Sequence, residues 1–219
     1  MIQVTHIKKK YGKKVVLEDI TFTVKPGEYV AIIGENGCGK STLLKIMADV
    51  MKADAGDVSY FGKTKDKNRL CGYVPQENPL LEDLSVKDNL FLWGGKNVMQ
   101  QKNVLEEFQL MDILETPVKK LSGGMKRRLS IACSMLKMPS ILLLDEPTAG
   151  LDFFYKEQIL DWIKSYREKN GMVLVVTHEE QEILNADRCL LMEAGKITEL
   201  NKDELTERKI REIIYKKYM

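Results

Sequence analysis

Apolar runs of a few residues alternate along this chain with longer segments of helical periodicity, a pattern that favours an α/β fold over an all-α or all-β one. Residues 30–33 are apolar on both faces, which predicts a fully buried parallel strand. We expect a strand at residues 189–192 to pair with residues 196–199 across a turn at Ala194-Gly195. The other candidate strands are residues 58–61, 71–74, 141–144 and 173–176.

The first 30 residues have the pattern of an antiparallel unit. Residues 15–17 form one apolar run, and Ile20, Phe22 and Val24 then alternate with polar residues. Pro26-Gly27 follows as a turn. An N-terminal antiparallel β-subdomain is therefore expected beside the parallel sheet.

Helical spacing replaces the strand pattern between about residues 77 and 139, where no strand is convincing. We predict that this segment is a helical subdomain inserted into the α/β core. Phe91 and Trp93 are interpreted as part of its core, and the alternative is exposure in a groove where another protein docks. A charged C-terminal helix within about residues 201–219, running from about residue 203 to residue 218, is expected to pack onto the domain.

Length and composition are those of an ordinary globular domain. The chain has 219 residues, of which 44% are hydrophobic and 30% charged, unlike a disordered chain. We expect a single domain over residues 1–219, because one domain of this length buries roughly 70% of its unfolded surface. The longest apolar stretches are far shorter than the ~20 residues that cross a bilayer. The N-terminus lacks the apolar region of a signal peptide, so export of the chain is not expected.

Charge and cysteine content exclude further classes. With 34 Lys and Arg against 32 Asp and Glu, the net charge of +2 argues against a dedicated nucleic-acid binder. A lysine cluster is interpreted as a solvated hairpin edge, with nucleic-acid binding as the alternative; its members are Lys8, Lys9, Lys10, Lys13 and Lys14. The four cysteines lack metal-ligand spacing, so we expect reduced thiols in a cytosolic protein; they are Cys38, Cys71, Cys133 and Cys189.

A phosphate-binding pattern follows the strand at residues 30–33 and leads into a helical run. Its residues are Gly34, Glu35, Asn36, Gly37, Cys38, Gly39, Lys40, Ser41 and Thr42. Glycines let successive backbone N–H groups face one anion, and the helix N-terminus adds its positive dipole end. We expect Lys40 to reach the β- and γ-phosphates of a nucleotide and Ser41 to bind Mg²⁺. A glycine-rich turn without a ligand is the alternative.

Two carboxylates end the candidate strand at residues 141–144. In P-loop folds, an aspartate in the position of Asp145 lies close to the magnesium ion. The adjacent Glu146 is then placed to polarise an attacking water. Guanine specificity is not expected, because Thr148 stands where a GTPase has glycine. These elements predict a P-loop nucleoside triphosphatase.

The segment Leu121-Ser122-Gly123-Gly124-Met125 resembles the signature loop of ATP-binding cassette (ABC) ATPases, and the resemblance extends over nearly the whole chain. Tyr11 matches the aromatic residue that stacks on adenine, and Gln76 matches the Q-loop glutamine. Residues 149–152 resemble the D-loop, and His178 matches the switch histidine. Met125 departs from the family, which most often has glutamine at this position.

The resemblance implies an ABC ATPase fold and a nucleotide-sandwich dimer. ATP on the P-loop of one subunit would be covered by the signature loop of the other; that loop consists of Ser122, Gly123 and Gly124. Gln76 and Asp145 would contact the magnesium ion with Ser41, and Gln76 would sense the membrane partner. Glu146 would be the general base, and His178 would hold the γ-phosphate and the attacking water.

The activity implied is hydrolysis of MgATP coupled to transport through separate integral membrane permease subunits. The subunit would act as a homodimer, or as a heterodimer with a second ABC ATPase, at the cytoplasmic face of the membrane. The chain has no room for the C-terminal regulatory domain of some sugar importers and looks most like the ATP-binding subunits of bacterial exporters, which favours export. A DNA-repair or ribosome-associated ABC ATPase is the alternative, and a soluble P-loop kinase leaves the signature loop unexplained.

Cys38 is expected to be the reactive thiol of the chain. It lies at the start of the helix that follows the P-loop and near Lys40, and both features favour a lowered thiol pKa. The other three cysteines lie in apolar sequence contexts and are expected to react slowly.

Overall fold

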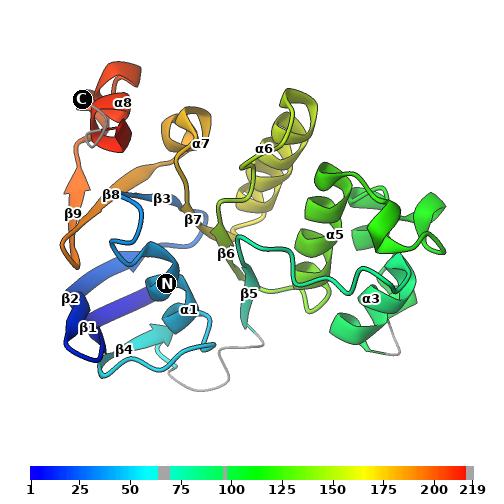
Figure 1. The fold of residues 1–219 in the computed structure, drawn as a ribbon, viewed down its shortest axis with the longest axis horizontal. Helices are drawn as coiled ribbons and strands as arrows, with labels where there is room; N and C mark the ends of the chain where they lie inside the picture. Colours follow the sequence, from blue (N-terminus) through cyan, green and yellow to red (C-terminus); the bar gives the residue numbers. More distant parts are fainter. Residues whose placement is uncertain (64–69, 96–97, 216–219) are drawn as a thin grey trace.

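Two β-sheets and a helical region make up the fold in the computed structural model, which describes residues 1–63, 70–95 and 98–215 (Figure 1). The smaller sheet is antiparallel and has the order β2-β1-β4. Its strands are β1 (Ile2–Tyr11), β2 (Lys14–Val24) and β4 (Ala55–Tyr60). The predicted antiparallel unit is therefore present, but β1 was not predicted, and the two apolar runs of residues 15–24 form one strand.

The larger sheet has six strands in the order β5-β6-β7-β3-β8-β9. Its strands are β3 (Tyr29–Ile33), β5 (Cys71–Val74), β6 (Ile141–Asp145), β7 (Met172–Val176), β8 (Arg188–Glu193) and β9 (Lys196–Leu200). The first five strands in this order pair in parallel, and β9 pairs antiparallel with β8. The hairpin predicted around Ala194-Gly195 is confirmed.

Helices cover the larger sheet and form a separate region between β5 and β6 (Figure 1). The α-helices are α1 (Lys40–Met47), α3 (Val86–Gly94), α4 (Lys102–Glu107), α5 (Gly123–Met135), α6 (Phe153–Glu168), α7 (Glu180–Asn185) and α8 (Glu207–Tyr215). Short 3₁₀ turns occupy Val98–Gln100, Met111–Ile113, Val118–Lys120 and Lys202–Glu204. The elements described between β5 and β6 are all helical, as the spacing in that segment predicts.

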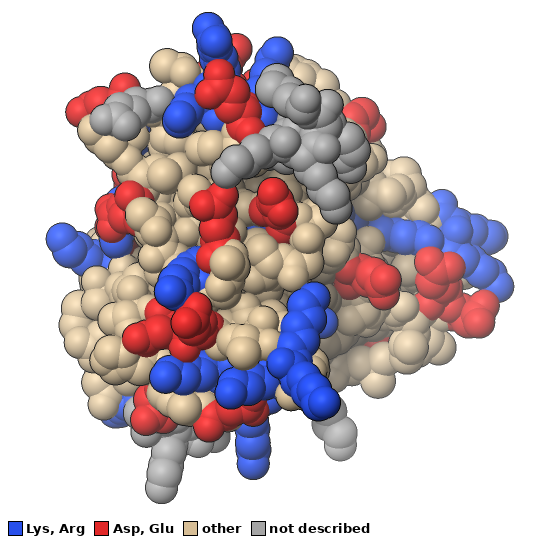
Figure 2. All heavy atoms as spheres, turned by 60° about the vertical axis from the view of Figure 1, so that its left-hand side comes forward, with Lys and Arg blue, Asp and Glu red and all other residues tan. Residues whose placement is uncertain are grey.

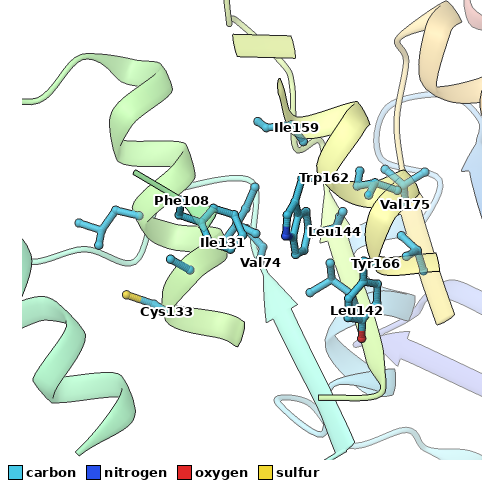
Figure 3. Close-up of a cluster of buried hydrophobic side chains, with 14 of the residues drawn as sticks. Val74, Phe108, Ile131, Cys133, Leu142, Leu144, Ile159, Trp162, Tyr166 and Val175 are labelled. Atoms are coloured by element: carbon cyan, nitrogen blue, oxygen red, sulfur yellow. The ribbon is translucent and has the colours of Figure 1, made fainter. Parts of the chain in front are cut away.

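The larger sheet separates two apolar cores. Along β6, Leu142 and Leu144 belong to one cluster of buried side chains, and Ile141 and Leu143 belong to the other. The first cluster includes aromatic side chains between α4 and α6, where the ring centroids of Phe108 and Trp162 lie 5.0 Å apart (Figure 3). Each fully buried aliphatic side chain contributes about 1.5–3 kcal/mol, so burial on both faces explains the continuous apolar runs.

Two predicted helical features differ from the structure. Helix α8 begins at Glu207 rather than near residue 203, because the Asn201 side chain accepts a hydrogen bond from the Asp203 N–H and starts a 3₁₀ turn instead. Residues 216–219 of the predicted helix lie outside the described residues. The packing is as expected, since Ile210 is fully buried in the first cluster.

Trp93 is not a core residue of the helical region. Its side chain is 44% exposed, whereas Phe91 is partly buried against the first cluster. Helix α3 buries Val86, Asn89 and Leu90, and Gly94 in its last turn lies close to Leu136 and Val98. Helical spacing gives the direction of a side chain but not whether a neighbouring element covers it.

Charge is distributed evenly over the face shown in Figure 2, where Lys and Arg side chains are interspersed with Asp and Glu. On the β1–β2 hairpin, the Lys9 ammonium lies 2.8 Å from the Asp54 carboxylate, so part of the lysine cluster is neutralised by acidic neighbours. Among the described residues, no helix is both long and apolar enough to span a bilayer.

Candidate nucleotide-binding site

The segments that carry the candidate site leave the larger sheet at one edge. Strands β3, β5, β6 and β7 run parallel, so the segments that follow their carboxyl ends meet. A pocket of about 560 Å³ lies there. Its lining residues are Tyr11, Lys14, Val16, Asn36, Gly37, Gly39, Lys40, Ser41, Thr42, Gln76, Glu146 and His178. Ten of these are site residues predicted from the sequence; the other two are Val16 and Lys14, of which Lys14 was interpreted as part of a solvated hairpin edge.

The P-loop has a backbone that requires glycine. Gly39 has a φ of 114°, and a Cβ atom there would lie 2.9 Å from the Leu17 side chain and 3.0 Å from Val16. Gly34 has a φ of 148°, and a Cβ atom there would lie 2.2 Å from the Met192 carbonyl oxygen. Helix α1 begins directly after this loop, so the positive end of its dipole faces the pocket.

Lys40 places a buried positive charge in the pocket. Its side chain is only 5% exposed, and its ammonium donates to the carbonyl oxygens of Gly34, at 2.6 Å, and Glu35, at 3.0 Å. Burial lowers the pKa of Lys40, while the nearby Cys38, Glu146 and Asp145 side chains raise it. A cation held among loop backbone groups suits a phosphate ligand.

Ser41 and Asp145 form a pair of oxygen donors beside the P-loop. The Ser41 hydroxyl donates to Asp145 Oδ1 at 3.2 Å, and the Asp145 side chain is nearly fully buried. Burial raises the pKa of Asp145, the Ser41 hydrogen bond lowers it, and the charge of Glu146 raises it. Hydroxyl and carboxylate oxygens are the ligands that Mg²⁺ takes when substrate phosphates complete its coordination, so this donor set fits the ion.

Glu146, Gln76 and His178 line the pocket together, and each of them follows a different strand of the larger sheet. Gln76 Nε2 donates to Glu146 Oε2 at 2.9 Å, and His178 Nε2 lies 3.7 Å from Glu146 Oε1. Neither ring nitrogen of His178 has a hydrogen-bond partner among the described residues. Burial and the charge of Lys40 lower the pKa of His178, so the imidazole is neutral at pH 7.

Tyr11 ends β1 at the rim of the same pocket. Its side chain is 48% exposed, and its hydroxyl donates to the Met51 sulfur at 3.0 Å. An exposed aromatic ring held at one end of a pocket offers a flat surface on which a base can stack.

The signature loop does not line this pocket. Ser122 caps α5, where its hydroxyl accepts a hydrogen bond from the Met125 N–H at 3.2 Å. Ser122 and Gly123 are exposed, whereas Gly124 packs so closely that an added Cβ would lie 2.3 Å from the Tyr155 ring. A nucleotide in the pocket therefore meets the P-loop but not the signature loop of the same chain.

A family model described as ABC transporter matches residues 17–149, which is more than half of the chain. The chain belongs to the ABC transporter family. It is 34% identical over 212 residues to the Nod factor export ATP-binding protein I of Burkholderia lata, covering 90% of this chain and 70% of that protein. It is 35% identical over 213 residues to the spermidine/putrescine import ATP-binding protein PotA of Bacteroides thetaiotaomicron, covering 91% and 46% respectively.

Solved structures agree with this assignment. A dimeric ATP-binding cassette in a post-hydrolysis state, bound to ADP and Pi, superposes with a TM-score of 0.82 at 26% sequence identity, covering 92% of this chain and 99% of that one. The resemblance to ABC ATPases and the predicted α/β fold, a P-loop core with an antiparallel β-subdomain and an inserted helical subdomain, are confirmed. The chain is an ABC ATPase.

Cys38 of this ABC ATPase does not have the environment expected from the sequence. Burial raises the pKa of its thiol, and this effect outweighs the charge and the backbone hydrogen bond of Lys40, which lower it. The position next to a helix start was correctly predicted, but the loop packs the Cys38 side chain against the second apolar cluster. Burial also raises the pKa values of Cys71, Cys133 and Cys189 to about 12, as their apolar contexts suggest.

Proposed function

We propose that this ABC ATPase is the ATP-binding subunit of a transporter, and that it drives substrate transport through separate integral membrane permease subunits. The observation that carries the proposal is the convergence of the P-loop, Gln76, Glu146 and His178 on one pocket. The matched relatives named above are ATP-binding proteins of an exporter and of an importer, which supports a transport role.

ATP would bind with its adenine on Tyr11 and its phosphates in the P-loop. Support comes from the exposed Tyr11 ring at the rim and the buried Lys40 ammonium at the base of the same pocket. Phosphate contacts are assigned to Gly34, Glu35, Asn36, Gly37, Cys38, Gly39, Lys40, Ser41 and Thr42. Ser41, Gln76 and Asp145 would hold Mg²⁺, which supplies charge neutralisation at the β- and γ-phosphates.

Glu146 is assigned as the general base for hydrolysis. Its carboxylate lines the pocket and is held by Gln76 at 2.9 Å, so it can accept a proton from a water between it and the γ-phosphate. His178 is assigned a supporting role, because its unpartnered, neutral ring can donate to the γ-phosphate from one nitrogen. Lys40 would stabilise the negative charge that develops on the transferred phosphoryl oxygens.

A second subunit would complete the site. The signature loop lies outside the pocket of its own chain, and its exposed Ser122 and Gly123 begin helix α5. The hydroxyl of Ser122 and the N–H groups of Gly123 and Gly124 are assigned to an anion on a partner; Ser122 and Gly123 are exposed, whereas Gly124 is buried. We infer a nucleotide-sandwich dimer, either of two copies or with a second ABC ATPase; the similar cassette bound to ADP and Pi is itself dimeric.

The proposed location is the cytoplasmic face of the cell membrane, reached through the permease subunits. We favour export over import on the likeness to the Nod factor export protein, of which this chain covers 70%, against 46% of the putrescine import protein. Co-purification with its permease and a vesicle transport assay would decide the direction.

The test of the hydrolytic site is Glu146→Gln, which keeps the size of the side chain but cannot accept a proton. Turnover of ATP should fall by about 10²–10⁴-fold while ATP binding is retained. With hydrolysis blocked, the ATP-bound dimer should accumulate, and light scattering should measure it as a doubled mass. The matched control is Glu168→Gln, an exposed position at the end of α6. Near-normal turnover in the Glu146 variant refutes the assignment.

A further inference from the structure

Arg127 is a buried charged residue in the second turn of α5, the helix that begins at the signature loop. Its side chain is only 4% exposed. The guanidinium donates to three consecutive backbone carbonyl oxygens, beginning with the last residue of β6: Asp145 at 2.7 Å, Glu146 at 3.0 Å and Pro147 at 2.9 Å. It also donates to the Pro75 carbonyl oxygen at 2.6 Å, directly before Gln76. One side chain thus joins two of the segments that meet at the pocket, the one after β5 and the one after β6.

The turn that Arg127 holds has an unfavourable backbone. Glu146 has a φ of 48°, in the left-handed region that residues with a Cβ atom rarely adopt. Such a conformation persists only where the surroundings hold it. Three carbonyl groups in sequence directed at one guanidinium provide that restraint, and the geometry turns the Glu146 carboxylate towards Gln76 and the pocket.

The far end of the turn is held by a second buried side chain. The Thr148 hydroxyl donates to Glu182 Oε1 of α7 at 2.8 Å, and both residues are nearly fully buried. The carboxyl groups of Glu182 and Asp145, where ionised, raise the pKa of Arg127. Burial lowers the pKa of Arg127 to about 10, so its guanidinium remains charged at neutral pH and can make all of these bonds.

We propose that Arg127 is a positioning residue for the hydrolysis step: it holds the turn after β6 so that the Glu146 carboxylate faces the nucleotide, and it fixes this turn relative to Gln76. The assignment rests on the proposed role of Glu146. Because Arg127 stands five residues after Ser122 on the same helix, any shift of α5 moves the backbone of Glu146 with it. When the signature loop of this chain contacts ATP bound to a partner, α5 therefore transmits that contact to the position of Glu146 in this chain.

The test is Arg127→Lys, which keeps the charge but cannot reach four carbonyl groups with one ammonium. We expect kcat for ATP hydrolysis to fall about 10–100-fold through misplacement of the carboxylate, and the Kd for ATP to change less than about threefold. The matched control is Lys126→Met on the same helix, which removes a positive charge that is paired with Glu82 at 2.6 Å on the outer side. Its turnover should stay within about twofold of the unaltered protein.

A double-mutant cycle separates positioning from a general structural effect. If Arg127 acts through the Glu146 carboxylate, Arg127→Lys should reduce the residual turnover of Glu146→Gln by no more than about twofold, because the group it positions is already inactive. An effect as large as in the unaltered protein overturns the proposal, and so does a Kd for ATP that weakens in step with kcat.

Folding must be checked in the same set of proteins. Arg127→Met removes the hydrogen bonds from this side chain to four carbonyl groups and can fail to fold, so Arg127→Lys, with its thermal unfolding measured beside its ATP affinity, decides the outcome. The two proposals fail differently. Retained turnover in Glu146→Gln overturns the general base and, with it, the positioning role; an inactive Glu146→Gln with a fully active Arg127→Lys overturns the positioning role alone.

Discussion

Replacing Glu182 with glutamine should make the stability of this protein less dependent on pH. Glu182 is 1% exposed and accepts a hydrogen bond from Thr148, while its second carboxylate oxygen has no partner among the described residues. Burial raises the pKa of Glu182 to about 7, although hydrogen bonds from threonine hydroxyls and the charge of Arg127 act in the opposite direction. The folded protein therefore holds a proton that the unfolded chain releases near pH 4.5.

The sign and size of the effect follow from this difference in pKa. Because the folded pKa is the higher one, the stabilisation from the extra proton is fully present below about pH 4.5 and is lost as the pH rises to about 7. One pKa unit corresponds to about 1.36 kcal/mol, so the loss is on the order of 3 kcal/mol. Glutamine is neutral at every pH, so the Glu182→Gln variant does not lose this stability as the pH rises.

The assay is thermal unfolding of the unaltered protein and Glu182→Gln at pH 5 and pH 8. The free energy of unfolding of the variant, relative to that of the unaltered protein, should increase by about 2–3 kcal/mol from pH 5 to pH 8. For a domain of this length this corresponds to several degrees in Tm. Glu168→Gln, at an exposed position, is the control and should show no such growth. A difference in stability that is the same at pH 5 and pH 8 refutes the reasoning, because Glu182 would then not titrate between them.

Two further predictions concern the pocket. Tyr11→Ala should weaken ATP binding about five- to 150-fold, because it removes a stacking surface, while Tyr11→Phe should leave the affinity nearly unchanged. An equilibrium binding assay measures both, and unchanged affinity in the alanine variant would contradict the adenine contact. Because burial raises the pKa of Cys38 above the ordinary value of 9.0, its alkylation by iodoacetamide should be slow at pH 7 and should still be accelerating at pH 9. Peptide mass mapping at each pH measures the rate. Rapid modification at pH 7 would show that the thiol is exposed and ionised.

The parallel strands and the P-loop could be read directly from the sequence, because their causes are local. Strands β6 and β7 are apolar on both faces, and the P-loop needs glycine where its φ values are positive. Strand β1 escaped prediction for the opposite reason. His6 has a φ of 51°, and the pairing register with β2 shifts beyond Val4, so the alternation of buried and exposed residues is broken by contacts with neighbouring strands.

Arg127 shows why part of the site was missed. In the sequence it belongs to a basic run that reads as a solvated helix face. Its spacing from Gly124 and Ile131 places Arg127 on the buried face of α5. This spacing was the feature of the sequence that could have indicated its burial. Glu182 offered less, because α7 has only six residues and four acidic or amide side chains in a row precede Ile183. The partners of both residues are backbone or hydroxyl groups at the carboxyl ends of β5 and β6, which the tertiary fold alone brings within reach.

The pocket is lined by segments that follow four different strands of the larger sheet, and by Tyr11, Lys14 and Val16 of the smaller sheet. A fragment that contains the P-loop alone cannot form it, since the positions of Gln76 and His178 depend on the pairing of β5 and β7 through β6. Nucleotide binding is thereby linked to the cooperative folding of the sheet. At 100 times its Kd, a ligand that binds only the folded state adds about 2.7 kcal/mol to the free energy of unfolding. ATP would then act as a ligand chaperone during refolding, favouring chains in which all four strands have already paired.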